Sequence, residues 1–321
     1  MSNSRYDLTS LSFLNEFLVT PEIEPPPVFG HEIAKKFLTE SCVIPMLYPS
    51  MKSWAGVLLF GPAGVGKSSL VKSVVYGLNS KYPGKILVHF FSCSASSIVN
   101  KYRGESEKIL KGVFECAREI RQEHIGKREE GAKTISIIFI DELDSVFSST
   151  ANDESSARLR VELLKHIDGV ESGRSSNRVI VVGATNLPGD LGEALMRRFE
   201  KRCYISLPDS VQRRQIIDYH MKDIQVASDV DLDAVVEQTK GLSGADLKVM
   251  CREAAMGSVR RFLSGVKPQD FSKGDLEGIS TEMLGDTEVE DFSRAVENTR
   301  RTVNPETLTH LEKFDEIYGS R

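Results

Sequence analysis

Residues Gly61-Pro62-Ala63-Gly64-Val65-Gly66-Lys67-Ser68 fit the pattern G-x-x-x-x-G-K-[ST], and this stretch decides the fold that we predict. Ahead of it, residues 57–60 form a continuous apolar run of the kind that a buried parallel strand shows. Behind it, residues 69–78 carry a helical period. The pattern therefore lies between a strand and a helix, which is the context that it requires.

The composition of this loop indicates what it binds. Glycines let the backbone turn so that successive N–H groups point inward, and the N-terminus of the following helix adds positive potential. Lys67 is expected to reach the β- and γ-phosphates of ATP, and the hydroxyl of Ser68 is expected to bind Mg²⁺. The residues predicted to contact the nucleotide here are Gly61, Pro62, Ala63, Gly64, Val65, Gly66, Lys67, Ser68 and Ser69.

The overall composition sets limits on the class of protein. The chain has 321 residues, of which 40% are hydrophobic, and a net charge of −5, so nothing suggests a direct attraction to nucleic acid or to an anionic membrane. Its five cysteines are scattered without C-x-x-C spacing, which argues against zinc or a disulfide framework. With no signal peptide in the sequence, we expect the protein in the cytoplasm, with membrane contact only through partners.

The order of apolar segments predicts the fold. Strands are expected at 57–60, 86–91, 135–140, 179–183 and 203–206, with helical segments between them, so the first part should be an α/β fold with a parallel five-stranded sheet between helices. After residue 208 the pattern is helical throughout. We therefore expect an N-terminal linker at 1–24, a large nucleotide-binding domain at 25–208, and a small all-helical domain with a C-terminal helix at 209–321.

Polar residues follow two of the predicted strands. Asp141 and Glu142 come directly after an apolar strand, at the edge where open parallel sheets bind ligands. Asp141 suits a role in holding Mg²⁺, and Glu142 is placed to orient and deprotonate the attacking water. Asn186 follows the next strand, where it could hydrogen-bond that water or the γ-phosphate. Further on, Arg197 and Arg198 belong to a basic cluster.

These segments together resemble the AAA+ ATPase module in order and spacing. The resemblance rests on the loop at 61–68 and on residues 139–144, 183–186, 197–200 and 241–247, and it covers about residues 25–321. Within that family the chain is similar to the meiotic clade, which contains katanin, spastin, fidgetin and the vacuolar protein sorting ATPase that disassembles ESCRT filaments. The resemblance implies an Mg-ATP-hydrolysing homo-oligomer that assembles with ATP, as a hexameric ring.

The resemblance also implies roles for single residues. Asn186 would sense the γ-phosphate, and Arg197 and Arg198 would act as arginine fingers on the nucleotide of the neighbouring subunit, so that activity depends on assembly. Adenine and ribose would lie against Gly244 and Ala245 on one side and Phe29 and Gly30 on the other. The residues expected at the pore of the ring, where an extended polypeptide is gripped, are Lys101, Tyr102 and Arg103, with Arg158 in a second pore loop.

The features that would identify the subfamily disagree. Residues 101–108 are closest to the pore loop of katanin, and the short segment between Arg261 and Val289 also suits katanin. The C-terminal helix entered through Pro305 resembles the sorting ATPase instead. We take threading of ESCRT filament subunits as the main hypothesis, with location at endosomal membranes, and a microtubule-severing, katanin-like enzyme that acts on tubulin tails as the alternative.

Two further classes of protein are considered. The first is a nucleotide-dependent scaffold with negligible turnover, which a very slow rate in concentrated protein would reveal. The second is a DNA-acting AAA+ protein or a GTPase. A GTPase would need an N-K-x-D motif, which Asn100-Lys101-Tyr102-Arg103 does not provide, and no basic groove is evident.

Overall fold

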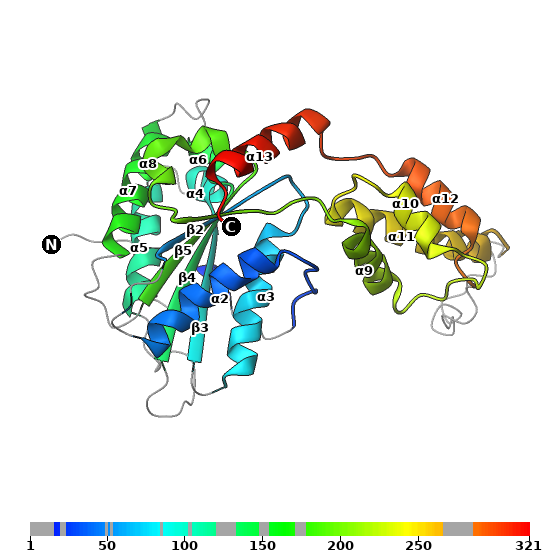
Figure 1. The fold of residues 1–321 in the computed structure, drawn as a ribbon, viewed down its shortest axis with the longest axis horizontal. Coiled ribbons are helices and arrows are strands. Elements are labelled where there is room, and N and C mark those ends of the chain that lie inside the picture. Colours follow the sequence, from blue (N-terminus) through cyan, green and yellow to red (C-terminus); the bar gives the residue numbers. More distant parts are fainter. Residues whose placement is uncertain are drawn as a thin grey trace. The chain divides into compact units, whose positions relative to one another are not determined.

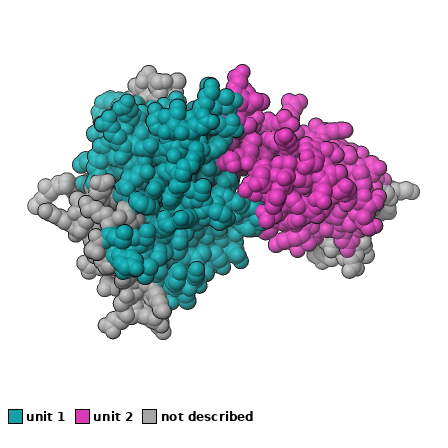
Figure 2. Space-filling view, in the orientation of Figure 1, with its two compact units in different colours: residues 1–61, 67–205, 309–321 teal, residues 62–66, 206–308 magenta. Residues whose placement is uncertain are grey.

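The computed structural model describes residues 16–19, 24–48, 51, 54–83, 86–101, 105–119, 133–147, 154–170, 178–265 and 285–321. The chain forms two compact units, which Figure 2 shows in different colours. The first unit comprises residues 1–61, 67–205 and 309–321, and the second comprises residues 62–66 and 206–308. Among the described residues, no helix is long and apolar enough to cross a membrane.

The first unit is built on a six-stranded sheet with the strand order β1-β3-β4-β5-β2-β6. The five strands from β2 to β6 are parallel, as predicted, and β1 runs antiparallel to β3. Every residue of β2 is buried, which explains its continuous apolar sequence. The strands are β1 (Leu18–Val19), β2 (Gly56–Phe60), β3 (Ile86–Ser94), β4 (Lys133–Asp141), β5 (Arg178–Thr185) and β6 (Lys201–Tyr204).

The sixth strand corrects the prediction of five strands preceded by a linker. Leu18 pairs with Phe91 and Val19 with Phe90, while the neighbouring Phe17 is buried in the core. The pairing covers the backbone groups of an edge strand, and the buried ring anchors it. Two residues are too short to show an alternating pattern, so the sequence could not reveal this strand.

Helices cover both faces of the sheet. Figure 1 shows α2 and α3 on one face and α5 and α7 on the other. One apolar core joins the sheet to α5 and α7 and includes Leu58, Ile138, Phe114 and Leu163. The helices of this unit are α2 (Glu32–Leu47), α3 (Lys67–Lys81), α4 (Ala95–Lys101), α5 (Ser106–Glu119), α6 (Asp144–Phe147), α7 (Glu154–Val170) and α8 (Gly192–Met196), with a 3₁₀ helix η2 (Pro188–Leu191).

The end of the chain also belongs to the first unit. From Thr309 onward, helix α13 (Pro305–Tyr318) groups with the sheet, although the sequence pattern placed all of 209–321 in the small domain. The ring of Phe314 meets that of Phe60 edge-on, with 5.1 Å between centroids. The backbone of Ser320 donates to the carbonyl of Arg202 at 2.8 Å, which extends the bonding of β6. A helical period predicts a helix but not the surface on which it packs.

The second unit is helical, as the sequence predicts. Its core contains Ile217 of α9, Leu247 and Met250 of α11 and Phe292 of α12. The described helices that lie wholly within it are α9 (Ser210–Met221), α10 (Leu232–Gln238), α11 (Gly244–Gly265) and α12 (Val289–Asn298).

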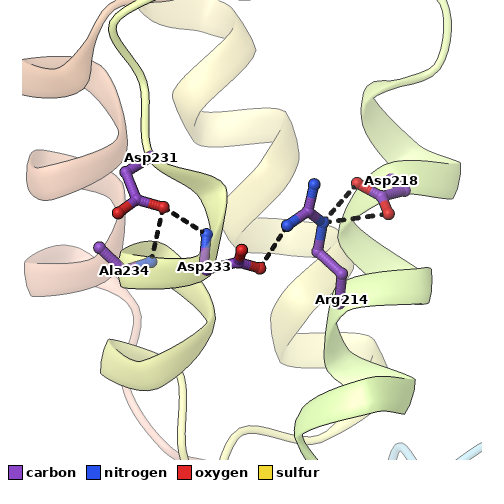
Figure 3. A network of polar contacts seen from close by, with 5 residues as sticks. All are labelled: Arg214, Asp218, Asp231, Asp233 and Ala234. Atoms are coloured by element: carbon purple, nitrogen blue, oxygen red, sulfur yellow. Dashed lines mark hydrogen bonds and ion pairs between the residues drawn. The ribbon is translucent and has the colours of Figure 1, made fainter.

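A polar network on the surface of the second unit links α9 to α10. Figure 3 shows Arg214 of α9 paired with Asp218 and Asp233, while Asp231 accepts hydrogen bonds from the first backbone N–H groups of α10. Asp231 therefore acts as the N-cap of α10.

The five cysteines are all buried thiols. Burial raises the pKa of Cys42, Cys93, Cys203 and Cys251 to about 12, and that of Cys116 to about 11. The nucleophilic thiolate form is therefore scarce at neutral pH.

Gly183 of β5 provides a test of the packing beneath the sheet edge. A Cβ there would lie 2.5 Å from the side chain of Leu143 and 2.7 Å from the ring of Phe199. We expect Gly183→Ala to lower the free energy of unfolding by about 1–3 kcal/mol through overpacking, measured by urea denaturation. The control is Gly77→Ala in α3, where the added methyl meets open space and should be neutral or stabilising. Equal stability of the two variants would show that Gly183 is not tightly packed.

Candidate active site

The phosphate-binding loop connects β2 to α3, as its sequence predicts. Lys67 is the first residue of α3 and is buried. Its Nζ donates to the carbonyl of Gly61 at 2.9 Å and to Oδ1 of Asn186 at 2.7 Å. Gly66, with φ at 90°, adopts a conformation that favours glycine directly before the lysine. The structure thus joins the loop to the tip of β5.

The charge of Lys67 is destabilised by loss of water. Burial lowers the pKa of Lys67 to about 8, and the nearby carboxylates Asp141 and Asp144 offset part of this effect. An ammonium group in such a place is stabilised by a further anion. The environment of Lys67 therefore fits the phosphates of a nucleotide.

Ser68 and Asp141 form the candidate metal site. The hydroxyl of Ser68 donates to Oδ2 of Asp141 at 2.7 Å, so an oxygen from α3 and one from the end of β4 converge. Hydroxyl and carboxylate oxygens are hard ligands of the kind that Mg²⁺ prefers, and Mg²⁺ is commonly held by one or two such groups together with phosphates. The residues present therefore fit this ion.

Glu142 lies directly after Asp141 in an unusual backbone conformation. Its φ is 56°, one of only two positive values among the described residues other than glycine. Its Oε2 accepts hydrogen bonds from the hydroxyls of Ser94, at 3.0 Å, and Ser96. The carboxylate predicted to activate water is thus held by two serines from the end of β3 and the start of α4.

These two serines and Asp144 are site residues that sequence reasoning missed. Oδ1 of Asp144 accepts from the Thr185 hydroxyl at 2.6 Å and from the Asn186 backbone at 3.2 Å, which fixes the tip of β5. Ser94 pairs in register with Asp141, so only the alignment of β3 with β4 could have revealed its place. For Asp144 the available signal was its position three residues after Asp141, within the segment 139–144.

The second unit contains the other part of the loop. The backbone N–H of Ala245 donates to the carbonyl of Gly64 at 3.0 Å, and a Cβ on Gly64 would lie 2.7 Å from the Ser243 hydroxyl. Gly244 starts α11 beside them. Gly64 and Ala245 are therefore neighbours, while their contact with adenine or ribose stays a prediction.

The remaining predicted nucleotide contacts precede α2. Gly30 and His31 both have positive φ, 75° and 59°, and turn the chain into the helix. Phe29 is half-buried beside them. Their contact with the nucleotide base also stays a prediction.

The predicted arginine fingers differ in environment. Arg197 is exposed and pairs with Glu193, whereas Arg198 pairs with Asp168 of α7. Among the pore residues, Arg158 is exposed and pairs with Glu154, with Glu107 at 3.9 Å. Tyr102, Arg103 and the side chain of Lys101 lie outside the described residues.

Comparison with known proteins identifies the family. The family of ATPases associated with various cellular activities (AAA) matches residues 57–207, and the AAA+ lid domain matches residues 229–273. The solved structure of the FIGL-1 AAA domain is 33% identical, with a TM-score of 0.76, covering 100% of this chain and 99% of that chain. The chain belongs to the AAA ATPase family. The expected α/β module with a helical lid is thereby confirmed.

Other relatives of this AAA protein are of the katanin kind. The A-like 1 katanin p60 ATPase-containing subunit of Danio rerio is 35% identical over 98% of this chain and 62% of its own length. The A1 katanin p60 ATPase-containing subunit of Arabidopsis thaliana is 34% identical over 94% of this chain and 55% of its own length. The chain thus spans 55% to 62% of these two relatives.

Two solved structures add to this comparison. A structure solved in work on katanin self-assembly is 28% identical, with a TM-score of 0.71, covering 97% of this chain and 98% of that one. The FIGL-1 AAA domain has also been solved with ADP. The ESCRT hypothesis gains no support from these relatives, and the katanin-like alternative fits them better.

The lowered pKa of Lys67 predicts how nucleotide affinity depends on pH. Above about pH 8 the free lysine is neutral, and bound phosphates favour its charged form, so binding must take up a proton. We expect the affinity for ADP to fall by up to about tenfold per unit as pH rises above 8, measured by calorimetry without metal. Lys67→Ala should bind more weakly and lose this slope. An unchanged slope in that variant would contradict the assignment.

Proposed function

We propose that this AAA protein is an Mg-ATP-hydrolysing, ring-forming remodelling enzyme of the katanin kind. The observation that carries the proposal is the hydrogen-bonded group of Lys67, Ser68, Asp141 and Asn186, with Glu142 beside it. All five residues expected for binding and cleaving a triphosphate lie in one place in the first unit.

In this proposal Lys67 binds the β- and γ-phosphates, and Ser68 and Asp141 hold Mg²⁺. The ion compensates the charge of the phosphates when it is bound. Asn186, whose amide oxygen faces Lys67, orients from its other atoms the γ-phosphate or the attacking water. Glu142 accepts the proton of that water once its carboxylate has left the hydroxyls of Ser94 and Ser96.

We further propose that hydrolysis requires a homo-oligomer, by resemblance a hexamer in the cytoplasm. An exposed arginine such as Arg197 is suited to act on the nucleotide of a neighbour, and a katanin structure related to this chain was solved in work on self-assembly. The substrate would be an extended acidic tail of tubulin, gripped in the pore by Tyr102. Threading of an ESCRT filament component is the alternative that a substrate test must compare.

Glu142→Gln provides the first test. The amide cannot accept the proton of water, so we expect retained ATP binding and a loss of turnover of at least about a hundredfold. The trapped protein should form a large particle with ATP, measured by sedimentation. The control is Glu237→Gln, an exposed position on α10, which should hydrolyse ATP normally.

Other outcomes separate the alternatives. Turnover in Glu142→Gln like that of the wild type would refute the role of this carboxylate. Assembly with ATP together with negligible turnover in the wild type would indicate a scaffold. Hydrolysis stimulated by intact tubulin but not by tubulin without its tails would support the katanin-like substrate, whereas stimulation only by ESCRT filament components would favour the other.

A further inference from the structure

Arg198 is held within its own protomer by a two-point contact. Its Nε donates to Oδ1 of Asp168 at 2.8 Å, and its Nη2 donates to Oδ2 at 2.7 Å. Its Nη1 donates to the carbonyl of Ala194. All three nitrogens of this guanidinium group therefore have partners in the first unit, and the side chain is only 27% exposed.

The backbone around Arg198 is fixed as well. The next residue, Phe199, is fully buried. Arg202 donates from Nε to the carbonyl of Phe199 at 3.1 Å and from Nη2 to that of Met196 at 2.9 Å. A Cβ on Gly56 would lie 2.2 Å from the carbonyl oxygen of Arg198, so the start of β2 packs tightly against this turn. The turn is therefore rigid on both sides.

Arg197 is in the opposite situation. Its side chain is 78% exposed, and its partner Glu193, one helical turn earlier, is 88% exposed. Such surface pairs contribute little because water screens them. Arg197 can thus leave Glu193 easily, whereas Arg198 would have to give up a bidentate contact and leave the carboxylate of Asp168 without it.

We propose that the two arginines divide the work. Arg197 alone contacts the nucleotide of the neighbouring protomer, and Arg198 is a positioning residue, clamped by Asp168, that orients the turn carrying Arg197. This inference rests on the proposed function, since it assumes hydrolysis across an interface between protomers. It changes the expectation that both arginines act as fingers.

Alanine substitutions test the proposal because the two roles predict opposite effects at Asp168. If Arg198 only positions the turn, Asp168→Ala and Arg198→Ala should lower kcat by a similar factor, about tenfold, and the double variant should lose no more than either single one. Arg197→Ala should lose on the order of 10³ in rate. Activity that is kept or raised in Asp168→Ala, but lost in Arg198→Ala, would overturn the proposal, because releasing Arg198 would then aid it.

Exchanging the charges gives a second test. Arg198→Asp should be strongly impaired, and adding Asp168→Arg should restore much of the lost activity. A carboxylate at position 198 cannot stabilise phosphate charge, so any recovery must come from positioning. A folded, assembling exchange variant as inactive as Arg198→Asp would count against the proposal. If thermal unfolding shows that this variant does not fold, the alanine series decides.

Asp218→Ala is a matched control. Asp218 accepts both Arg214 contacts at 2.9 and 3.1 Å, the same kind of pair on the surface of the second unit (Figure 3). We expect normal turnover in this variant, which shows that loss of a surface Arg–Asp pair is not harmful in general. Specific activity that is independent of protein concentration in the wild type, with no effect of Arg197→Ala, would refute the assembly itself and with it the role of Arg197.

Discussion

The buried ammonium of Lys67 is the constraint on which the rest of the site depends. A charged group that has left water must have partners, and here they come from the carbonyl of Gly61 and the side chain of Asn186, with Asp141 and Asp144 nearby. These partners lie at the ends of β2, β5 and β4, so the lysine ties three neighbouring strands together at one edge of the sheet. The glycines before Lys67, the register of the strands and the cap that Asp144 provides for Asn186 all serve to place these partners.

Much of this could be predicted from the sequence, for a physical reason. Strands that are buried on both faces, such as residues 57–60, must be apolar throughout, and the loop between β2 and α3 requires glycines, a lysine and a hydroxyl at fixed spacing. The same local rules place Asp141 and Asn186 at strand ends. Family membership then followed from the order of these motifs and was confirmed by comparison.

What the sequence could not predict depends on contacts between distant segments. Ser94 and Ser96 reach Glu142 only because β3 and β4 are in one particular register, and Asp168 reaches Arg198 across 30 residues. The packing of α13 is a similar case. Its resemblance to the sorting ATPase suggested a subfamily, yet Phe314 serves a local need by covering Phe60 beside the phosphate loop. A feature that the fold itself requires cannot distinguish between subfamilies, so the conflict within the sequence is resolved in favour of the katanin-like features.

The five buried cysteines have a practical consequence. Because their thiols are shielded and ionise poorly, maleimide dyes and nitroxide reagents should ignore them in the folded protein. The native chain thus offers a silent background for spectroscopy, in which a cysteine introduced at any exposed position becomes the single attachment point. One label on each unit would then allow energy transfer or electron resonance to follow their separation through the nucleotide cycle, without first removing natural thiols from the core.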